Sequence, residues 1–490
     1  MRAPWTRPLP SDAQGPEARR ATGHPHRSCR AHITRGSTTV LELNEIRRIF
    51  QAQRDHRRVM RHTTAAERVE RLERLRAEIL KRQEEIGRAI HQDLGRPADN
   101  RDEIQTVMGN LDKVRDELAD WMAPLSVEKS PATPAAERVF VTYQPRGVVL
   151  LFGTWDFPIG MFFSPLIQAI AAGNVVLAKT SSMAPATGDV IEQIVRAVFD
   201  EREVAVFNDG DVRTPNGVRS THDVLLDLPV DHIFLTGSPR VGKIIVERAA
   251  QHMASFTLEL GGKSPAIVDR TIDLDLVAQA FLGGKIYNHG QTCLSVDYVW
   301  VPEDLRGAFV GTYVAAVKKA YYDETGEFQW QRDGRFVDRR NYERVKGYLD
   351  EAVERGATVA FGGRTDADHL VIEPTVLLDV PKDTRIIQEE IFGPILPVLT
   401  YTDEEEIFAH SDSLGKPLGF SVYSTDDAFI QRMLDNTTSG GVTINGHAVH
   451  WAEENLPFGG VNSSGYGRYH GVWGFRELSN ARSVFHVAVG

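Results

Sequence analysis

Short stretches rich in apolar residues alternate with amphipathic stretches along the middle of the chain. The apolar stretches predict strands at Val148–Phe152, Val175–Ala178, Val204–Phe207, His232–Thr236 and Phe256–Leu260. The stretches between them predict helices at Gly160–Ala172, Ala184–Phe199, Val224–Leu228 and Val241–Met253. This alternation predicts a doubly wound α/β domain with a parallel sheet, which binds its ligand at the carboxyl ends of the strands.

Longer patterns precede this region. Apolar residues recur at helical spacing from Thr63 to Leu94, which predicts one long amphipathic helix ending near Gly95. A second helix is predicted from Glu103 to Met122. Val139–Tyr143 then alternates in the way an exposed edge strand would.

The later part of the chain repeats the α/β pattern from about Pro265 to Val442, which predicts a second domain. Its strands are predicted at Tyr298–Val301, Val376–Leu378, Ile395–Leu399 and Phe420–Tyr423. The segment from Pro457 to Gly474 is rich in glycine and aromatic residues, which is typical of a loop folded over a site. The polar segment Asn208–His222 is expected to be disordered.

Composition narrows the choice of partners. The 490 residues carry a net charge of −11, which argues against nucleic acid or an anionic membrane as the main partner. The most apolar stretch, Met161–Ala178, is interrupted by polar residues and therefore predicts a buried helix running into a strand, with no membrane span. Two cysteines without paired spacing exclude a disulfide framework and a cysteine zinc site, so we expect no metal and a reducing, cytoplasmic compartment.

The first 36 residues differ from the rest, with seven arginines against two acidic residues. We expect a disordered Arg-rich tail over residues 1–40 that is not part of the fold. A transit peptide has the same composition and stays open.

Candidate chemistry centres on Cys293, which follows the glycine-containing turn Asn288–Gly290. Such a thiol can be a covalent nucleophile, but a lone cysteine is often a small buried apolar residue, and position alone leaves both open. His289 could serve as the base of a cysteine hydrolase, although a partly exposed loop histidine is the simpler interpretation.

The stretch Gly237–Lys243 follows a predicted strand and opens a predicted helix. It nearly matches the phosphate loop of nucleotide triphosphatases, but Ile244 stands where the Mg²⁺-binding hydroxyl should be. The free N–H groups of such a helix start suit a dinucleotide pyrophosphate better.

Seven short motifs occur in one order along the chain. They are Gly153-Thr-Trp-Asp-Phe-Pro158, Lys179-Thr-Ser-Ser182, Phe234-Leu-Thr-Gly-Ser238, Leu258-Glu-Leu-Gly-Gly-Lys-Ser-Pro265, Gly290-Gln-Thr-Cys293, Glu389-Glu-Ile-Phe-Gly-Pro394 and Leu456-Pro-Phe-Gly-Gly460. Through them the chain resembles the aldehyde dehydrogenase superfamily from about Leu43 to Phe485. The segment Gly465–Gly471 makes it most similar to the class 3 and coniferyl-aldehyde branch.

The resemblance implies an NAD- or NADP-dependent oxidation of a small aldehyde to its acid. Cys293 would form a thiohemiacetal and then a thioester, which a water activated by Glu259 would release. The residues implied for the cofactor are Trp155, Lys179, Ser182, Gly237, Ser238, Gly242, Glu390 and Phe392. The resemblance also implies a homodimer, a dinucleotide-binding domain at 41–125 and 146–260, a catalytic domain at 261–445, and bridging segments at 126–145 and 446–490.

Two positions depart from the family pattern. Asp156 stands where the family usually has the asparagine that donates a hydrogen bond to the reacting oxyanion. Either Asp156 is protonated and donates in its place, or the protein is a slow, altered or catalytically impaired relative. Ser182 stands where the family often has a glutamate that binds the NAD ribose and would repel a 2′-phosphate. Because Lys179 supplies a positive charge nearby, we expect NADP to be tolerated or preferred and Ser182→Glu to shift preference to NAD.

Overall fold

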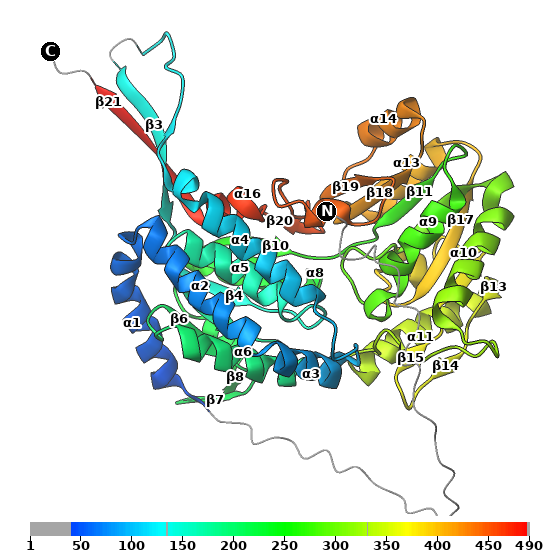
Figure 1. Ribbon diagram of the computed structural model, residues 1–490, viewed down its shortest axis with the longest axis horizontal. Helices are drawn as coiled ribbons and strands as arrows, with labels where there is room; N and C mark the ends of the chain where they lie inside the picture. Colours follow the sequence, from blue (N-terminus) through cyan, green and yellow to red (C-terminus); the bar gives the residue numbers. More distant parts are fainter. Residues whose placement is uncertain (1–40, 134–135, 331, 488–490) are drawn as a thin grey trace, which may run out of the picture.

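The computed structural model describes residues 41–133, 136–330 and 332–487. The chain forms two lobes that lie side by side, and an arm of antiparallel strands projects from the first lobe (Figure 1). The Arg-rich segment expected to be a disordered tail lies outside the described residues.

A six-stranded sheet forms the centre of the first lobe, in the order β20-β10-β9-β4-β5-β6. Its strands are β4 (Val148–Phe152), β5 (Val175–Lys179), β6 (Val204–Phe207), β9 (His232–Thr236), β10 (Ser255–Glu259) and β20 (Gly465–Tyr466). The first five are parallel, and β20 pairs antiparallel with β10. Because β5 and β6 lie on one side of β4 and β9 and β10 on the other, the sheet has the predicted doubly wound order.

Helices cover both faces of this sheet. They are α1 (Leu43–Arg61), α2 (Ala65–Lys81), α3 (Gln83–Leu94), α4 (Asp102–Met122), α5 (Gly160–Ala171), α6 (Pro185–Val198), α7 (Thr221–Leu226) and α8 (Pro239–His252). Alternate residues of a strand point to opposite faces. Val149 and Leu151 of β4 therefore share a core with α2 to α6, whereas Val148 and Leu150 share one with α1, α7 and α8.

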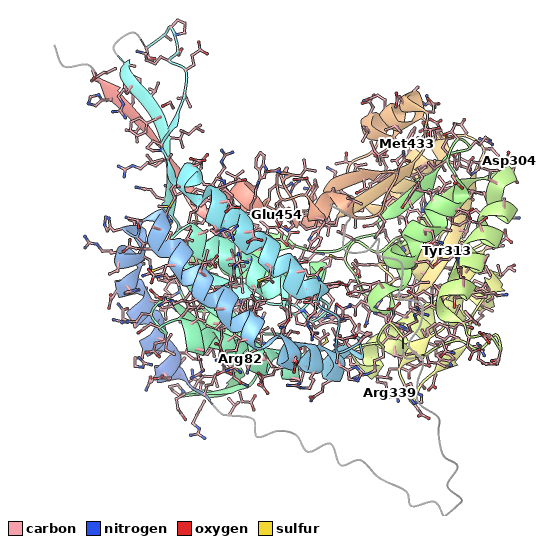
Figure 2. All side chains as sticks on the ribbon, in the orientation of Figure 1. Arg82, Asp304, Tyr313, Arg339, Met433 and Glu454 are labelled. Carbon is pink, nitrogen blue, oxygen red and sulfur yellow. The ribbon has the colours of Figure 1, made fainter. Side chains whose placement is uncertain are left out.

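The predicted long helix over 63–94 is two helices that meet at Arg82 (labelled in Figure 2). Its ends are as predicted, because Thr64 caps α2 and Gly95 ends α3 in a left-handed conformation with φ 73°. The break lets α2 pack on α4, α5 and α6, whereas α3 packs mainly on α6. A change of packing partner leaves no mark on the apolar periodicity, so the single helix was the wrong prediction.

The segment Asn208–His222 is ordered, which contradicts the expected disorder. It forms a hairpin of β7 (Asp211–Thr214) and β8 (Gly217–Ser220), to which β1 (Leu41–Glu42) adds a third strand. Val212 is fully buried and anchors the hairpin against the first lobe. A strand from the start of the described chain thus orders a segment that lacks an apolar pattern of its own.

The second lobe contains a seven-stranded sheet in the order β13-β16-β17-β12-β11-β18-β19. Its strands are β11 (Pro265–Val268), β12 (Tyr298–Pro302), β13 (Thr358–Phe361), β16 (Thr375–Leu378), β17 (Ile395–Tyr401), β18 (Gly419–Tyr423) and β19 (Gly441–Ile444). Its helices are α9 (Leu274–Phe281), α10 (Arg306–Tyr321), α11 (Arg339–Glu354), α12 (Arg385–Gln388), α13 (Glu405–Leu414) and α14 (Asp427–Asn436), beside a small hairpin of β14 (Thr365–Asp366) and β15 (Val371–Ile372). The four predicted strands are present, and they alternate with helices as expected.

The arm consists of β2 (Leu125–Ser126), β3 (Ala136–Pro145) and β21 (Ser479–Val487), with β3 in the middle. The predicted edge strand is therefore paired on both sides, by β2 and, along its length, by β21. Its half-exposed side chains produced the edge-like pattern. The glycine- and aromatic-rich segment before α16 (Gly471–Glu477) contains β20, whose Gly465 pairs with Glu259, the last residue of β10.

Within the described ranges, no helix is both long and apolar enough to cross a membrane.

Candidate active site

The loop that carries Cys293 holds an unusual backbone. Asn288, His289 and Gly290 follow one another in the left-handed region, with φ of 52°, 58° and 72°. Each non-glycine residue in that region costs roughly 1–2 kcal/mol, so the conformation persists only where its surroundings hold it.

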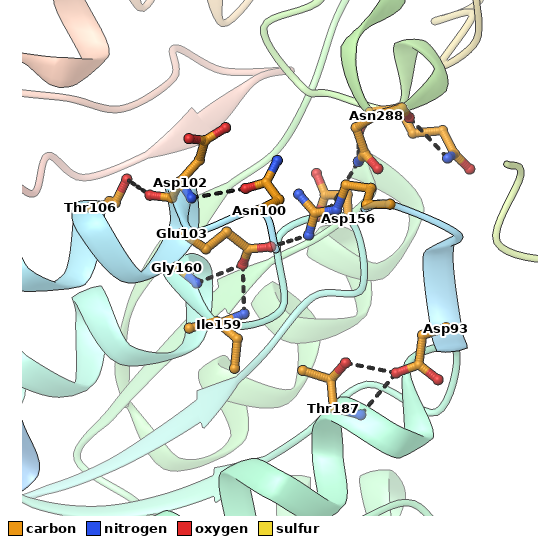
Figure 3. Close-up of polar contacts among 12 residues, drawn as sticks. Asp93, Asn100, Asp102, Glu103, Thr106, Asp156, Ile159, Gly160, Thr187 and Asn288 are labelled. Carbon is orange, nitrogen blue, oxygen red and sulfur yellow. Dashed lines mark hydrogen bonds and ion pairs between the residues drawn. The ribbon is translucent and has the colours of Figure 1, made fainter. Parts of the chain in front are cut away.

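Hydrogen bonds from both lobes hold this loop. The Asn288 amide donates to the carbonyl oxygens of Asp156, at 3.0 Å, and Gln291, at 2.9 Å. The Gln291 side chain accepts from the Val337 N–H at 3.0 Å and donates to the Arg335 carbonyl at 2.9 Å. The loop is thereby fixed against the turn after β4, which is shown with Asn288 and Asp156 in Figure 3.

Gly290 completes this arrangement because no side chain fits there. A Cβ atom would lie 2.4 Å from the Gly393 backbone carbon and 2.8 Å from the Lys285 carbonyl oxygen. The glycine therefore lets the backbone of the nucleophile loop approach the segment Glu389–Pro394, and it brings two of the sequence motifs together.

His289 is buried at 4% exposure, so the expectation of a partly exposed loop histidine was wrong. Its Nε2 accepts the backbone N–H of Ile372 at 3.0 Å, and its ring packs edge-on against Phe336. Burial lowers the pKa of His289 to about 3. A neutral imidazole whose acceptor nitrogen is already bonded in the second lobe cannot act as the base for Cys293, which removes the basis of the hydrolase hypothesis.

Cys293 borders a cavity of about 650 Å³, its open mouth included. The cavity walls are mostly apolar and are contributed by both lobes. Its lining includes Phe157, Met161, Tyr287, Leu294, Ala448 and Trp451. Asp102 and Thr106 of α4 and His447 add polar groups. Such a cavity suits an apolar molecule whose reactive end reaches the thiol.

The charges of three carboxyl groups act on the thiol. Burial raises the pKa of Cys293 well above its usual value, and the charges of Asp156, Glu390 and Glu259 raise it further. Glu259 is buried at the end of β10, and neither of its carboxyl oxygens has a hydrogen-bond partner within the described chain. Burial raises the pKa of Glu259 well above 4.5. The backbone carbonyl of Glu259 accepts the N–H of Gly237 at 2.9 Å, so the end of β10 and the Gly237 turn lie together.

Asp156 is buried at 4% exposure, and its Oδ1 accepts the Thr154 hydroxyl at 2.7 Å. Burial raises the pKa of Asp156 from 3.8 to about 6, although the Thr154 hydrogen bond lowers it, and the charge of Glu103 adds to the rise. The carboxyl group is therefore ionised at neutral pH and becomes a hydrogen-bond donor as the pH falls through about 6.

The other cofactor candidates also gather near this point. Trp155, just past β4, contacts Phe392 of the second lobe in a T-shaped pair with ring centroids 5.4 Å apart. Glu390 accepts the N–H of Gly262 at 3.1 Å, and burial raises its pKa to about 8. A Cβ at Gly261 would lie 2.1 Å from the Glu390 carboxylate, so that glycine makes room for it.

Three long helices begin at the carboxyl ends of the parallel strands, and buried carboxylates already occupy two of their N-termini. Glu103 accepts the N–H groups of Ile159 and Gly160 at the start of α5, at 2.7 and 2.8 Å. Asp93 accepts the N–H and the hydroxyl of Thr187 at the start of α6 (Figure 3). Glu103 is in turn paired with the buried Arg96.

The third helix, α8, has no side-chain cap, and no carboxylate contacts its first N–H groups within the described chain. Its N-cap is Ser238, which follows Gly237. Gly242 faces the sheet, where a Cβ would lie 3.1 Å from the Leu260 side chain, so it serves close packing of α8 on β10. The start of α8 therefore fits a phosphate group, because its N–H groups and dipole attract anions.

Lys179 ends β5 but is not the free cation that the expectation of NADP assumed. Its ammonium group donates to the Thr180 carbonyl at 3.0 Å and pairs with Asp209 at 2.9 Å. Ser182 is exposed in the turn that follows. Sequence reasoning missed Asp209 because it lies in the segment expected to be disordered; its position two residues past a predicted strand was the available signal.

Within the described residues, no group of three or more His, Cys, Asp and Glu side chains could hold a metal ion. The donor set described above fits a dinucleotide instead. It offers open N–H groups at a helix start, a lysine beside a carboxylate at neighbouring strand ends, and a buried carboxyl group next to the thiol.

Comparison with known proteins gives a consistent result. The family model described as "Aldehyde dehydrogenase family" matches residues 31–484. "Aldehyde dehydrogenase family 3 member A2" of Pongo abelii is 37% identical over 90% of this chain and 87% of its own. The Canis lupus familiaris protein "Aldehyde dehydrogenase, dimeric NADP-preferring" is 35% identical over 85% of this chain and 89% of its own. A solved structure of Staphylococcus aureus AldH in a substrate-bound state is 31% identical, with a TM-score of 0.82 over 91% of this chain and 94% of that one.

Proposed function

Because the chain belongs to the aldehyde dehydrogenase family, whose members oxidise aldehydes with NAD or NADP, we propose that Cys293 is its nucleophile and that apolar aldehydes are its substrates. One observation carries this proposal. The thiol borders an apolar cavity, and the charges of the Asp156, Glu390 and Glu259 carboxyl groups act on it.

The thiolate of Cys293 attacks the aldehyde carbon and forms a thiohemiacetal whose oxyanion needs a hydrogen-bond donor. NAD or NADP, when bound, would accept the hydride that leaves the thiohemiacetal carbon, and the Cys293 thioester would remain. Glu259, once ionised, removes a proton from the water that attacks the thioester, and the acid leaves while Cys293 is regenerated. Both Cys293 and Glu259 have raised pKa values, so both steps gain from rising pH.

For the cofactor we propose that Gly237 and Ser238 receive the pyrophosphate at the start of α8. Lys179 and the exposed turn at Ser182 lie at the adenosine ribose. Glu390 holds the nicotinamide ribose, with Trp155 and Phe392 as the walls of the cleft between the lobes, and Gly242 acts through the packing of α8. The buried carboxylates of Glu103 and Asp93, which contact the starts of α5 and α6, support this assignment, because they leave α8 as the open start among these three helices.

The substrate class follows from the cavity walls, which suit an aromatic or a medium-chain aliphatic aldehyde. The deciding experiment is a panel of such aldehydes, together with acetaldehyde and a charged aldehyde, assayed for NADH and NADPH formation separately. We expect kcat/KM to rise with the apolar surface of the aldehyde. Ester hydrolysis without cofactor, in the absence of aldehyde oxidation, would contradict the proposal.

Asp156→Asn is expected to speed oxidation most at neutral and alkaline pH. With a pKa of about 6, about a tenth of the Asp156 carboxyl groups can donate at pH 7 and about a hundredth at pH 8. A permanent amide donor should therefore raise kcat about tenfold at pH 7 and about 100-fold at pH 8, with less than a twofold change at pH 5. Rate profiles of both proteins from pH 5 to 9 test this.

The same substitution has a second readout in stability. The folded-state pKa lies above that of the free carboxyl group, so the ionised form destabilises the fold above pH 6 and this cost disappears toward pH 4. Asp156→Asn should therefore stabilise the protein by up to about 3 kcal/mol at pH 7.5 and hardly at pH 4. An equal gain at both pH values in urea unfolding, or a lower oxidation rate at pH 8, would contradict this role of Asp156.

For assembly we propose a homodimer joined through the edge strand β21 of the arm. Phe485 and Val487 on β21 are about half exposed, and so is Ile444 on β19, the edge strand of the second sheet. Unpaired edges with apolar side chains are sites of strand addition. We further propose 41–125 with 146–260 as the cofactor domain, 261–445 as the catalytic domain, and a reducing, cytoplasmic compartment that keeps Cys293 as a free thiol.

Light scattering of the full chain should give twice the 54.6 kDa chain mass. Replacing Phe485 and Val487 by aspartate should give the monomer mass, because two carboxylates cannot be buried in an apolar contact. Met253→Asp is the control, since Met253 is 91% exposed and lies at the end of α8, outside the three strands of the arm. A monomeric unmodified chain, or a dimer that survives the double substitution, would rule out this contact.

A further inference from the structure

The strands β5 and β6 end side by side and carry opposite charges. Lys179, the last residue of β5, is in register with Phe207, the last residue of β6, and Asp209 follows two residues later. In doubly wound domains the strand next to the first one ends at the adenosine ribose, where an acidic residue commonly accepts a hydrogen bond from the 2′-hydroxyl. In this chain that strand ends in a lysine, and the neighbouring strand supplies the carboxylate.

The ion pair with Asp209 neutralises the charge of Lys179. The Lys179 side chain is 7% exposed and makes its two contacts to Asp209 and to the Thr180 carbonyl. The Asp209 side chain is 47% exposed and uses Oδ1 for the pair. No hydrogen bond to its Oδ2 is present in the described part of the chain. The surface at the strand ends is therefore that of a half-exposed carboxylate over a neutralised lysine.

Neighbours on both sides fix Asp209 in place. The Asn208 side chain accepts the Thr180 hydroxyl at 2.7 Å and donates to Glu192 at 2.7 Å. The Gly210 carbonyl accepts both the N–H and the hydroxyl of Thr221, at 3.0 and 2.9 Å. The β7–β8 hairpin that follows is pinned by β1. The Asp209 carboxylate thus lies in a turn that hydrogen bonds of its two neighbours hold in place.

From these contacts we infer that Asp209 is a specificity-determining residue. Its carboxylate accepts a hydrogen bond from a hydroxyl of the adenosine ribose and disfavours a 2′-phosphate, so the chain prefers NAD to NADP. The inference rests on the proposed function, because it needs the adenosine ribose at the end of β5. A ribose hydroxyl is a donor that a carboxylate accepts, whereas a 2′-phosphate would add about two negative charges beside it. Ser182 supplies no charge there. Asp209 therefore has the role that a glutamate at the position of Ser182 often has in the family.

The test measures binding of adenosine 5′-monophosphate and adenosine 2′,5′-bisphosphate to the full chain by calorimetry. These probes differ only at the 2′ position and need no turnover. The unmodified protein should bind the monophosphate at least about tenfold more tightly. Asp209→Asn should shift the affinity ratio toward the bisphosphate by about 10- to 100-fold, because it removes the repulsion and frees the charge of Lys179.

Asp211→Asn removes the same charge from an exposed position at the start of β7, and it should leave the ratio within twofold. Adding Ser182→Glu to Asp209→Asn should restore the preference for the monophosphate. If Asp209→Asn still bound both probes with an unchanged affinity ratio, the role of Asp209 would be wrong, and the proposed cofactor site would stand. Binding of neither probe to any variant would overturn the cofactor site of the proposed function and this inference with it.

Discussion

Replacing Cys293 by serine is expected to reduce aldehyde oxidation by at least about 10³-fold while cofactor binding stays within twofold. A serine hydroxyl is a far weaker nucleophile than a thiolate, and the imidazole of His289 cannot activate it, because its acceptor nitrogen is bonded to the Ile372 N–H. The measurement is NADH or NADPH formation with saturating aldehyde, together with calorimetric titration of the cofactor.

Cys29 offers the matched control, since it is the other cysteine of the chain. Cys29→Ser should keep full activity, and iodoacetamide should inactivate both the unmodified protein and Cys29→Ser. Retention of more than a tenth of the activity in Cys293→Ser would show that the thiol is not the nucleophile. Equal loss in both variants would point to a general effect of cysteine on folding.

Glu259→Gln is expected to lower the steady-state rate by about 10²- to 10⁴-fold and to leave the first turnover largely intact. Glutamine has the same shape, and both Glu259 oxygens lack partners in the described chain, so the fold loses no hydrogen bond. Hydride transfer precedes the step that needs the base, so a rapid-mixing experiment should show a burst of NADH or NADPH close to one per Cys293, followed by a slow phase.

Glu454→Gln is the control for this substitution. Glu454 (labelled in Figure 2) is another glutamate with a raised pKa, about 7 through burial, and it bonds to the Asn110 amide of α4. Its replacement should leave both phases unchanged within about threefold. If the burst disappeared with the steady-state rate in Glu259→Gln, the residue would act before or during hydride transfer, and its proposed role in deacylation would be wrong.

The first sheet could be predicted closely from the sequence because its parallel strands are buried on both faces. Such strands read as continuous apolar runs, and the helices between them carry a clear period. The same logic located β12, β16, β17 and β18 in the second lobe. It missed β11, whose four residues follow a glycine-rich motif and lie inside the sheet through partners 33 and 155 residues away.

The remaining errors share one cause, which is that distant segments decide local structure. The helix over 63–94 breaks at Arg82 because its first half packs on α4 and α5 as well as on α6, whereas its second half packs mainly on α6. The hairpin at 211–220 is ordered by β1. Neither partner is visible in the local pattern. The edge-like pattern of β3 likewise reflects its half-exposed side chains, and it contains no sign of the pairing with β21.

The site divides in the same way. Cys293, Glu259, Glu390 and Phe392 could be named from linear motifs, although their roles remain proposals. The groups that position these residues could not be named in this way, because they come from distant segments of the chain. Glu103 and Asp93 occupy two helix starts from far upstream, and Asn288 holds the nucleophile loop to the Asp156 carbonyl. Asp209 was hidden because its segment was expected to have no structure at all.

Pairing between the two ends of the chain has a consequence for biosynthesis. β10 can pair with β20 only after residue 465 has been synthesised. β3 can pair with β21 only after more than 300 further residues have been synthesised. At the usual pace of 5–20 residues per second, a ribosome needs on the order of 20 to 70 s to cover that distance. During this time the nascent first lobe displays two open strand edges, which invites chaperone binding in the cell and misassembly in its absence.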